Sequence, residues 1–463
     1  MTPFVPLALF GFLPLVLYLF NRFPAQRAVV VSFVAGYLFL PQPGFGARYY
    51  LLQGIPPYEK ISALSYCVLV ATILFGSKRL SSFQPGWIDL PMLIWCLFCP
   101  LAAQFANGLS PISPTTAQII NWGVPYFLGR IYFNDLAGLR QLAVGIFAGG
   151  MAYVPLCLLE MRISPTLHLR VYGFHARADF GQTVRYGGYR PTVFLEHGLW
   201  VGMWMMTATL LGIVLWRTKV IKKLWNYPVN WLVLVLFVTF LLVKSTGAYL
   251  YLAIAIGIWF TSRWLRTPLP MLLISAVISL YLYLGATGEL YKIPQVNDFL
   301  IASESSTNDR SQSLAFRIAN EKLLSSKAQL KMAFGWGDGG GNRIYDASGK
   351  DISVTDSLWI IVFGQQGIVG LLTFSTMLLL PSLSFAFLCY PPSTWSNRKV
   401  APAAGLALVL VLYLMDSSLN AMICPVFILA NGGLAGLVLK EPETTKTKSI
   451  RAALPRRTLA QQR

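Results

Sequence analysis

The sequence is poor in charged residues, and this shortage is its strongest global signal. Only 12% of the 463 residues are Asp, Glu, Lys or Arg, whereas 55% are hydrophobic. A soluble globular domain has about a quarter charged residues, so the composition excludes a soluble protein. The hydrophobic runs are of helix length and do not alternate strictly with polar residues, which predicts helices rather than a membrane β-barrel.

Residues that build covalent or metal frameworks are also scarce. The six cysteines lie within or beside hydrophobic runs, so no disulfide framework is expected. Cys96-x-x-Cys99 has the spacing of one helix face, and we interpret it as helix packing rather than as a redox or zinc pair. His168, His175 and His197 lack the spacing of a zinc motif, so we expect neither a metal nor another cofactor.

Thirteen apolar stretches approach the length that crosses a bilayer. They predict an all-α fold, a polytopic transmembrane helical bundle of about 12–13 spans. The first stretch lacks the basic start and cleavage site of a signal peptide, so we treat it as a span. The stretches cover approximately residues 3–20, 28–41, 60–76, 87–106, 117–133, 138–160, 194–216, 228–244, 247–262, 269–286, 356–388, 401–416 and 421–439.

Lysines and arginines are concentrated in alternate connections between these stretches. Basic connections face the cytoplasm, which places the N-terminus outside and the C-terminus inside. The net charge of +19 is therefore first a signal of topology, and no nucleic-acid partner is expected. The basic residues are Arg22, Arg27, Lys78, Arg79, Arg140, Arg217, Lys219, Lys222, Lys223, Arg263, Arg266, Arg398 and Lys399, with more in the tail.

This topology divides the chain into four parts. Residues 1–287 hold ten spans and an arginine-rich outer loop at 161–193, and residues 288–355 form one large exoplasmic loop. Residues 356–440 hold the remaining spans. Residues 441–463 are polar and basic, so we expect a disordered cytoplasmic tail that contacts the inner leaflet.

The loop at 161–193 departs from the topology rule. It is short and faces outward, yet it is rich in arginine, and moving arginine across a membrane is unfavourable. The loop either lies on anionic lipid headgroups or binds a phosphate or diphosphate, whose oxygens match the planar guanidinium. Its arginines are Arg162, Arg170, Arg177, Arg185 and Arg190.

The loop at 288–355 holds three further polar features. Arg317 lies on a helix-like segment, where it forms either a substrate contact or an ion pair with Glu321, four residues on. The turn Gly335-Trp-Gly-Asp-Gly-Gly-Gly341 either cradles phosphate with its amides or folds the loop back on the bundle. It lacks the lysine and serine of a nucleotide-binding loop, so ATP is not expected. Asp356 lies where the chain re-enters the membrane, and a carboxylate there is costly unless it is paired or has a function. The alternative is that Thr355 or Asp356 caps the N-terminus of the next helix.

Ionisable residues from distant parts of the chain map to the outer third of the bundle. Arg190, Glu196 and His197 lie at the mouth of the span near residue 194. Lys244 ends another span, and Asp416 lies at the outer end of a third. Spare charges scattered at random would not share one depth, so the pattern predicts a single polar site.

Five positions or short motifs follow one another along the chain: Tyr126-Phe-Leu-Gly-Arg130, Arg190-Pro-x-x-Phe-x-x-His197-Gly, Arg317, Phe334-Gly-Trp-Gly337 and Gly367-Ile-Val-Gly370-Leu371. Together they resemble motifs of the bacterial O-antigen ligase and O-antigen polymerase superfamily of membrane glycosyltransferases. The resemblance covers most of the membrane region and is strongest from Ser311 to Leu371. Two departures favour a polymerase over a ligase: Asp356 stands where ligases usually carry histidine, and Ser245-Thr246-Gly247 stands where they carry Ser-Arg-Gly.

The resemblance implies transfer of a glycan from a polyprenyl diphosphate to a sugar hydroxyl in the periplasm, at the outer face of the bacterial inner membrane. It also implies a chain-length regulator as a partner. Ligation to a lipid or protein acceptor, and transport of a lipid-linked glycan without bond chemistry, remain alternatives. The candidate catalytic residues are Asp356, Arg317, Glu196 and His197. The candidate substrate-binding residues are Arg190, Arg185, Arg343, Lys244 and Asp338.

Overall fold

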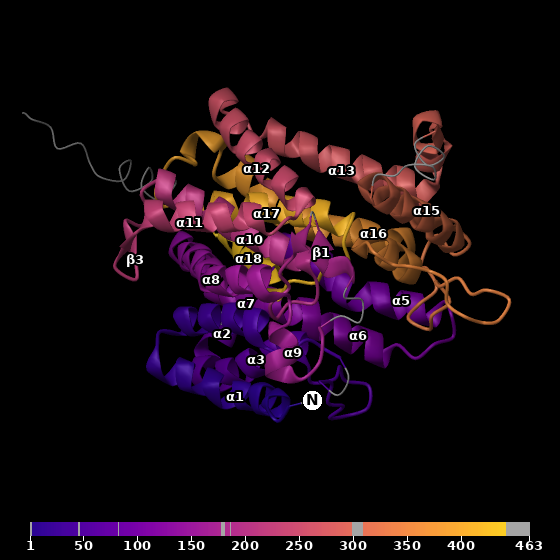
Figure 1. The fold of residues 1–463 in the computed structure, drawn as a ribbon, viewed down its shortest axis with the longest axis horizontal. Helices are drawn as coiled ribbons and strands as arrows, with labels where there is room; N and C mark the ends of the chain where they lie inside the picture. The colour runs from indigo at the N-terminus through magenta and orange to yellow at the C-terminus, as the bar shows by residue number, and fades with distance from the viewer. Residues whose placement is uncertain are drawn as a thin grey trace, which may run out of the picture.

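The structure, a computed structural model, describes residues 2–44, 47–81, 83–176, 181–185, 187–298 and 309–440, with side chains throughout except at 309–314. Within these residues the regular structure is almost entirely helical (Figure 1). The strands form two small hairpins, β1 (Val184–Arg185) with β2 (Gly188–Tyr189) and β3 (Lys223–Leu224) with β4 (Tyr227–Pro228). The all-α prediction is confirmed.

Eight helical segments of the described residues are long and apolar enough to cross a membrane. The chain is therefore a multi-pass membrane protein. The segments are α1 (Phe4–Arg22), α3 (Lys60–Leu80), Trp87–Phe105, α8 (Leu136–Ile163), α10 (Gly198–Arg217), α12 (Thr246–Leu265), α13 (Leu269–Thr287) and Leu358–Cys389, which contains α16 (Leu358–Ser384).

The other predicted spans are also helical but shorter or composite. Four apolar helices have fewer than 18 residues: α2 (Ala25–Phe39), α11 (Val229–Leu242), α17 (Ala401–Ser417) and α18 (Pro425–Leu439). The stretch predicted at 117–133 consists of α6 (Ile112–Gln118), the π-helical turn η3 (Ile119–Gly123) and α7 (Val124–Tyr132). The segment Trp87–Phe105 is likewise built from η1 (Trp87–Asp89), α4 (Leu90–Leu93), η2 (Ile94–Phe98) and α5 (Cys99–Phe105).

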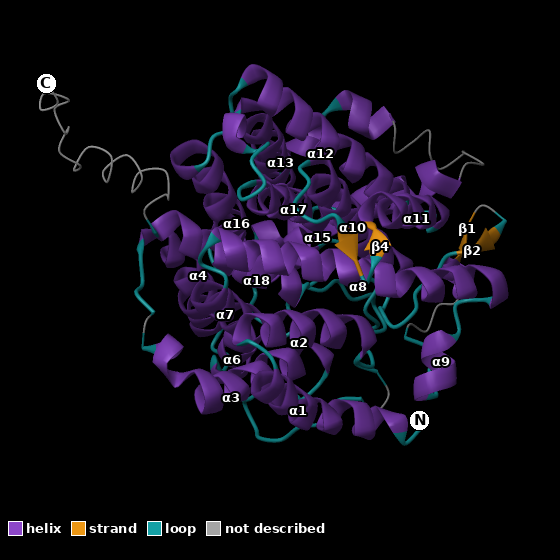
Figure 2. Cartoon of the chain, turned by 90° about the vertical axis from the view of Figure 1, so that its left-hand side faces the viewer, coloured by secondary structure: helices purple, strands orange, loops and turns teal. Residues whose placement is uncertain are grey.

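The centre of the bundle is formed by α10, α17 and α18, with α1–α3 on one side and α12 and α13 on the other (Figures 1 and 2). Nearly every residue of α17 and α18 is buried, as expected for helices that are apolar all round. Glycines bring α18 against α7: a Cβ on Gly432 would lie 2.0 Å from the Tyr126 carbonyl oxygen, and one on Gly129 would lie 2.1 Å from that of Leu429. Small residues permit this backbone approach.

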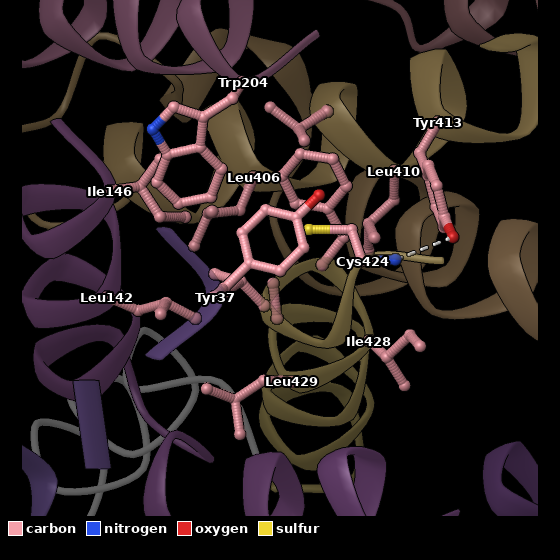
Figure 3. Close-up of a cluster of buried hydrophobic side chains, with 14 of the residues drawn as sticks. Tyr37, Leu142, Ile146, Trp204, Leu406, Leu410, Tyr413, Cys424, Ile428 and Leu429 are labelled. Carbon is pink, nitrogen blue, oxygen red and sulfur yellow. Dashed lines mark hydrogen bonds between the residues drawn. The ribbon is translucent and has the colours of Figure 1, made fainter. Parts of the chain in front are cut away.

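A cluster of buried side chains from α2, α8, α10, α17 and α18 fills this centre (Figure 3). The rings of Tyr37 and Trp204 lie 5.5 Å apart. The Tyr413 hydroxyl donates to the Met422 carbonyl (2.7 Å) and accepts from the Cys424 amide (3.3 Å). It thereby fixes the turn between α17 and α18, which carries residues of the site described below.

The stretch between α13 and α16 packs onto the bundle where it is described. It begins with η5 (Glu289–Lys292) and contains α15 (Asp309–Gln329), which contacts both α13 and α16. α16 is interrupted at Gly367, whose φ of 65° and ψ of −162° are not helical. The remaining short elements are α9 (Leu167–Tyr172), η4 (Gly181–Thr183), η6 (Phe385–Cys389) and η7 (Pro392–Thr394).

Candidate functional site

Seven of the nine predicted site residues line one cavity of about 850 Å³. Its walls come from the β1–β2 hairpin, the segment leading into α10, the start of α12, helix α15, the segment before α16 and the turn after α17. These parts are remote in sequence, so the expectation of one shared polar site agrees with the geometry. The seven residues are Arg185, Arg190, Glu196, His197, Lys244, Arg317 and Asp356.

The cavity is rich in positive charge. Four cationic side chains face two carboxylates, which leaves an excess of two positive charges when His197 is neutral. Low-dielectric walls strengthen the field of such a cluster, and an anionic ligand is therefore the kind that it would concentrate.

Arg317 is the cation whose orientation is best defined. Its Nη1 donates to the Leu419 carbonyl (3.1 Å) and approaches Asn420 Oδ1 (3.5 Å), and its Nε lies 3.8 Å from Asp356 Oδ2. Asn420 is itself fixed, because its amide donates to Asp416 Oδ1 (2.6 Å). The buried turn after α17 thus aims the guanidinium at the cavity and at Asp356.

The alternative partner of Arg317, Glu321, is engaged elsewhere. Its carboxylate accepts hydrogen bonds from Ser357 Oγ (2.7 Å), the Tyr281 hydroxyl (2.8 Å) and Trp359 Nε1 (3.2 Å). Burial raises the pKa of Glu321 above its ordinary value, and these donors oppose the shift. Arg317 also lowers the pKa of Glu321 through its charge, but the close ion pair of Arg317 is with Asp356, and Glu321 instead ties α15 to α13 and α16.

Capping does not explain Asp356. The N-cap residue of α16 is Ser357, not Thr355 or Asp356, so the capping alternative is wrong. Asp356 instead lies at the cavity wall with about a third of its side chain exposed (33%). A carboxylate that is accessible and paired with a cation can both accept a proton and contact a ligand.

His197 has a structural task that the sequence did not reveal. It is the N-cap of α10, and its Nδ1 accepts from the Leu199 amide at 3.0 Å. Its Nε2 lies 2.8 Å from Gln182 Oε1, so the proton belongs on Nε2. Because the lone pair of Nδ1 caps the helix, His197 is a poor candidate for a general base.

Arg190 and Lys244 also line the cavity. Arg190 is buried, its Nη2 donates to Ser245 Oγ (3.2 Å), and a Cβ on Gly198 would lie 2.7 Å from its side chain. Lys244 has a positive φ of 58°, and its Nζ donates to the Arg185 carbonyl (3.1 Å). Both cations therefore lie beside the N-terminus of α12, whose amides add positive potential.

The glycine-rich turn is a packing element. The amides of Gly335, Trp336 and Gly337 donate to the carbonyls of Lys331, Gly364 and Gln365 at 2.8–2.9 Å. A Cβ on Gly335 would lie 2.5 Å from Gln365 backbone, and one on Gly367 would lie 2.4 Å from the Ala333 carbonyl oxygen. The backbone of the turn therefore packs directly against the backbone of α16 at its interruption. These three amides are thus already bonded within the protein, and the geometry agrees with the alternative of a turn that folds back on the bundle.

Two predicted substrate-binding residues lie outside the cavity. Asp338 accepts from Gln365 Nε2 (3.1 Å), and Arg343 lies 3.6 Å from Asp351. Both belong to the surface of the turn rather than to the cavity lining. Partial desolvation by the neighbouring chain raises the pKa of Asp338 above its ordinary value. The sequence placed these residues close to Arg317 along the chain, but the fold separates them from it.

Other predicted positions fall away from the cavity as well. Arg130 forms a buried pair with Asp89, with Nε 2.7 Å from Oδ1 and Nη2 3.1 Å from Oδ2, and Tyr126 donates to the same carboxylate at 2.7 Å. This motif joins α7 to η1. Arg177 and the tail at 441–463 lie outside the described residues.

The sequence interpretation missed Glu160, Lys60 and Asn420. Glu160 and Lys60 are buried charges at the ends of otherwise apolar helices, which was a usable signal.

In the part of the chain that the structure describes, no group of three or more His, Cys, Asp or Glu residues is arranged to hold a metal ion. No family model matches the chain, and no curated protein matches it.

Proposed function

We propose that the protein is a membrane glycosyltransferase that polymerises oligosaccharide repeat units carried on polyprenyl diphosphate. The observation that carries the proposal is the single cavity in which four cations meet Asp356 and Glu196. The proposed setting is the outer face of a bacterial inner membrane, with the N-terminus outside and the C-terminus in the cytoplasm. A chain-length regulator is a proposed partner.

The proposed reaction transfers the donor glycan to a hydroxyl of the acceptor glycan. The acceptor oxygen forms a bond to the anomeric carbon, and the bond from that carbon to the diphosphate oxygen breaks. The acceptor proton passes to a carboxylate, and the lipid diphosphate leaves with the electron pair of the broken bond. The activated bond arrives with the lipid, so neither nucleotide nor metal is needed for energy.

The cations have the task of holding the leaving diphosphate. Arg190, Arg185 and Lys244 line the cavity near the N-terminus of α12, and Arg317 lines it beside Asp356. Preorganised donors of this kind stabilise charge that develops in the transition state, at no cost of reorganisation. The turn after α17 preorganises Arg317 through Leu419 and Asn420.

Asp356 is the proposed general base, because it lines the cavity and lies beside Arg317. Glu196 is the second candidate and lines the same cavity. His197 is a weaker candidate than either carboxylate, since protonation of its Nδ1 would break the cap on α10.

One observation favours a second function. The interruption of α16 at Gly367 is the kind of broken helix that transporters use at their substrate sites. The backbone at 332–337 covers this interruption, and Gly367 does not line the cavity, so transport of a lipid-linked glycan ranks below transfer. Ligation to a lipid or protein acceptor would use the same cavity, with a different acceptor.

The test uses protein purified in detergent, a short glycan on polyprenyl diphosphate, and neither nucleotide nor metal. Products are resolved by mass. A ladder spaced by one repeat unit, with release of lipid diphosphate, is the expected result. Intact donor despite measurable binding would overturn the proposal and favour transport.

A further inference from the structure

The segment Arg190–His197 is buried without regular secondary structure. Val193 and Leu195 are completely buried, and Val193 has a positive φ of 52°. Buried peptide groups need hydrogen-bond partners, and a loop has no helix or sheet to supply them. Because the segment begins and ends in the cavity lining, whatever holds its middle also sets where Arg190 and Glu196 stand.

Glu160, near the end of α8, supplies the first set of partners. Its Oε2 accepts from the amides of Thr192 (2.8 Å) and Val193 (2.7 Å), and its Oε1 accepts from the Leu167 amide (2.9 Å). The side chain is completely buried. Hydrogen bonds to a carboxylate are among the strong ones, so this residue fixes two successive peptide units of the segment.

Lys60, the first residue of α3, supplies a second hydrogen-bond partner for the backbone of this segment. Its Nζ donates to the Phe194 carbonyl at 2.8 Å, and Gln42 Nε2 donates to the same oxygen at 3.0 Å. Lys60 is 1% exposed and lies within electrostatic range of Glu196. The peptide units from 192 to 194 are thus held by a carboxylate on one side and an ammonium on the other.

We infer that Glu160 and Lys60 are positioning residues, which hold Arg190 and Glu196 in the cavity by binding the backbone between them. Neither side chain lines the cavity. The inference rests on the proposed function only in taking the cavity to bind a diphosphate. It differs from a purely structural role because Arg190 is the cation that this segment carries into the cavity, so the effect of either residue on pyrophosphate binding should pass through Arg190.

A double-mutant cycle separates these roles. Inorganic pyrophosphate is titrated calorimetrically into the full-length protein, purified in detergent, as the unaltered protein and as Glu160→Gln, Arg190→Ala and the double variant. Glu160→Gln is expected to weaken pyrophosphate binding by about tenfold and to have no further effect once Arg190 is removed. The matched control is Asp135→Asn, at the opposite end of α8, where the carboxylate accepts from the Gly138 amide (2.6 Å). It should leave binding unchanged.

Equal weakening in both backgrounds, or a lower melting temperature with unchanged binding, would overturn the inference. If Glu160→Gln does not fold, Gln42→Ala removes a neutral donor to Phe194 and should show the same coupling to Arg190 with a smaller, severalfold effect. Absence of pyrophosphate binding by the unaltered protein would overturn the inference together with the anion site. Coupled binding without glycan transfer would overturn the proposed reaction alone.

Discussion

Replacing Arg317 with alanine should abolish most of the glycan transfer while leaving the fold intact. Arg317 is a quarter exposed (25%), and its guanidinium is held by the Leu419 carbonyl and by Asn420. Its loss removes a preorganised cation from the cavity and leaves Asp356 without its partner. Removing one donor that stabilises developing charge typically lowers kcat by about 100- to 1,000-fold, which is the loss expected here.

Arg343→Ala is the matched control. Arg343 follows Arg317 in the same polar stretch, lies 3.6 Å from Asp351 with 35% exposure, and thus forms a pair much like that of Arg317 with Asp356 at 3.8 Å. Exposed pairs contribute little, so transfer should stay within about twofold of the unaltered protein. Arg317→Lys keeps the charge but cannot reproduce the contacts of the planar guanidinium, so the rate of transfer should fall about tenfold.

The assay is single-turnover release of lipid diphosphate, with folding monitored by the melting temperature of each variant. The reasoning is refuted if Arg317→Ala melts like the unaltered protein and still makes long polymer. It is also refuted if Arg343→Ala loses as much activity as Arg317→Ala, because the cavity would then not distinguish the two arginines.

Three further predictions concern His197, Gly367 and His168. His197→Asn should retain glycan transfer because asparagine can also cap α10. His197→Ala should lose about 1 kcal/mol of stability, measured by denaturation in detergent. Complete loss of activity in the asparagine variant would instead support His197 as the general base. Gly367→Ala should lower the melting temperature, since its Cβ would meet the Ala333 carbonyl oxygen at 2.4 Å with a positive φ; an unchanged melting curve would contradict this. Burial lowers the pKa of His168 from 6.5 to about 4, so the unfolded chain binds more protons between these values. Stability should therefore fall as the pH drops from about 7 to 4, and His168→Gln should flatten this slope in melting curves recorded across that range.

Much of the candidate site could be predicted from the sequence. Arginines that must cross the membrane and carboxylates at its edge are costly, so Arg190 and Asp356 were conspicuous, and Arg317 stood out on a helix-like segment of the large loop. Asp338 and Arg343 were grouped with them because of their nearness along the chain, and the fold separates them from the cavity. Glu160 and Lys60 could have been noticed as charges at the ends of apolar helices, but the sequence does not show that their partners are backbone atoms of the segment before α10.

The sequence by itself determined the helices, because helix formation in an apolar chain depends on local length and hydrophobicity. It also determined that the polar residues gather in a few connections. Only the tertiary structure decided which charges meet: Arg317 turns to Asp356 rather than to Glu321, since Glu321 is taken by donors from α13 and α16. It likewise decided that the amides of Trp336 and Gly337 in the glycine turn bond to carbonyls of α16. These outcomes depend on contacts between distant segments, and no local pattern encodes them.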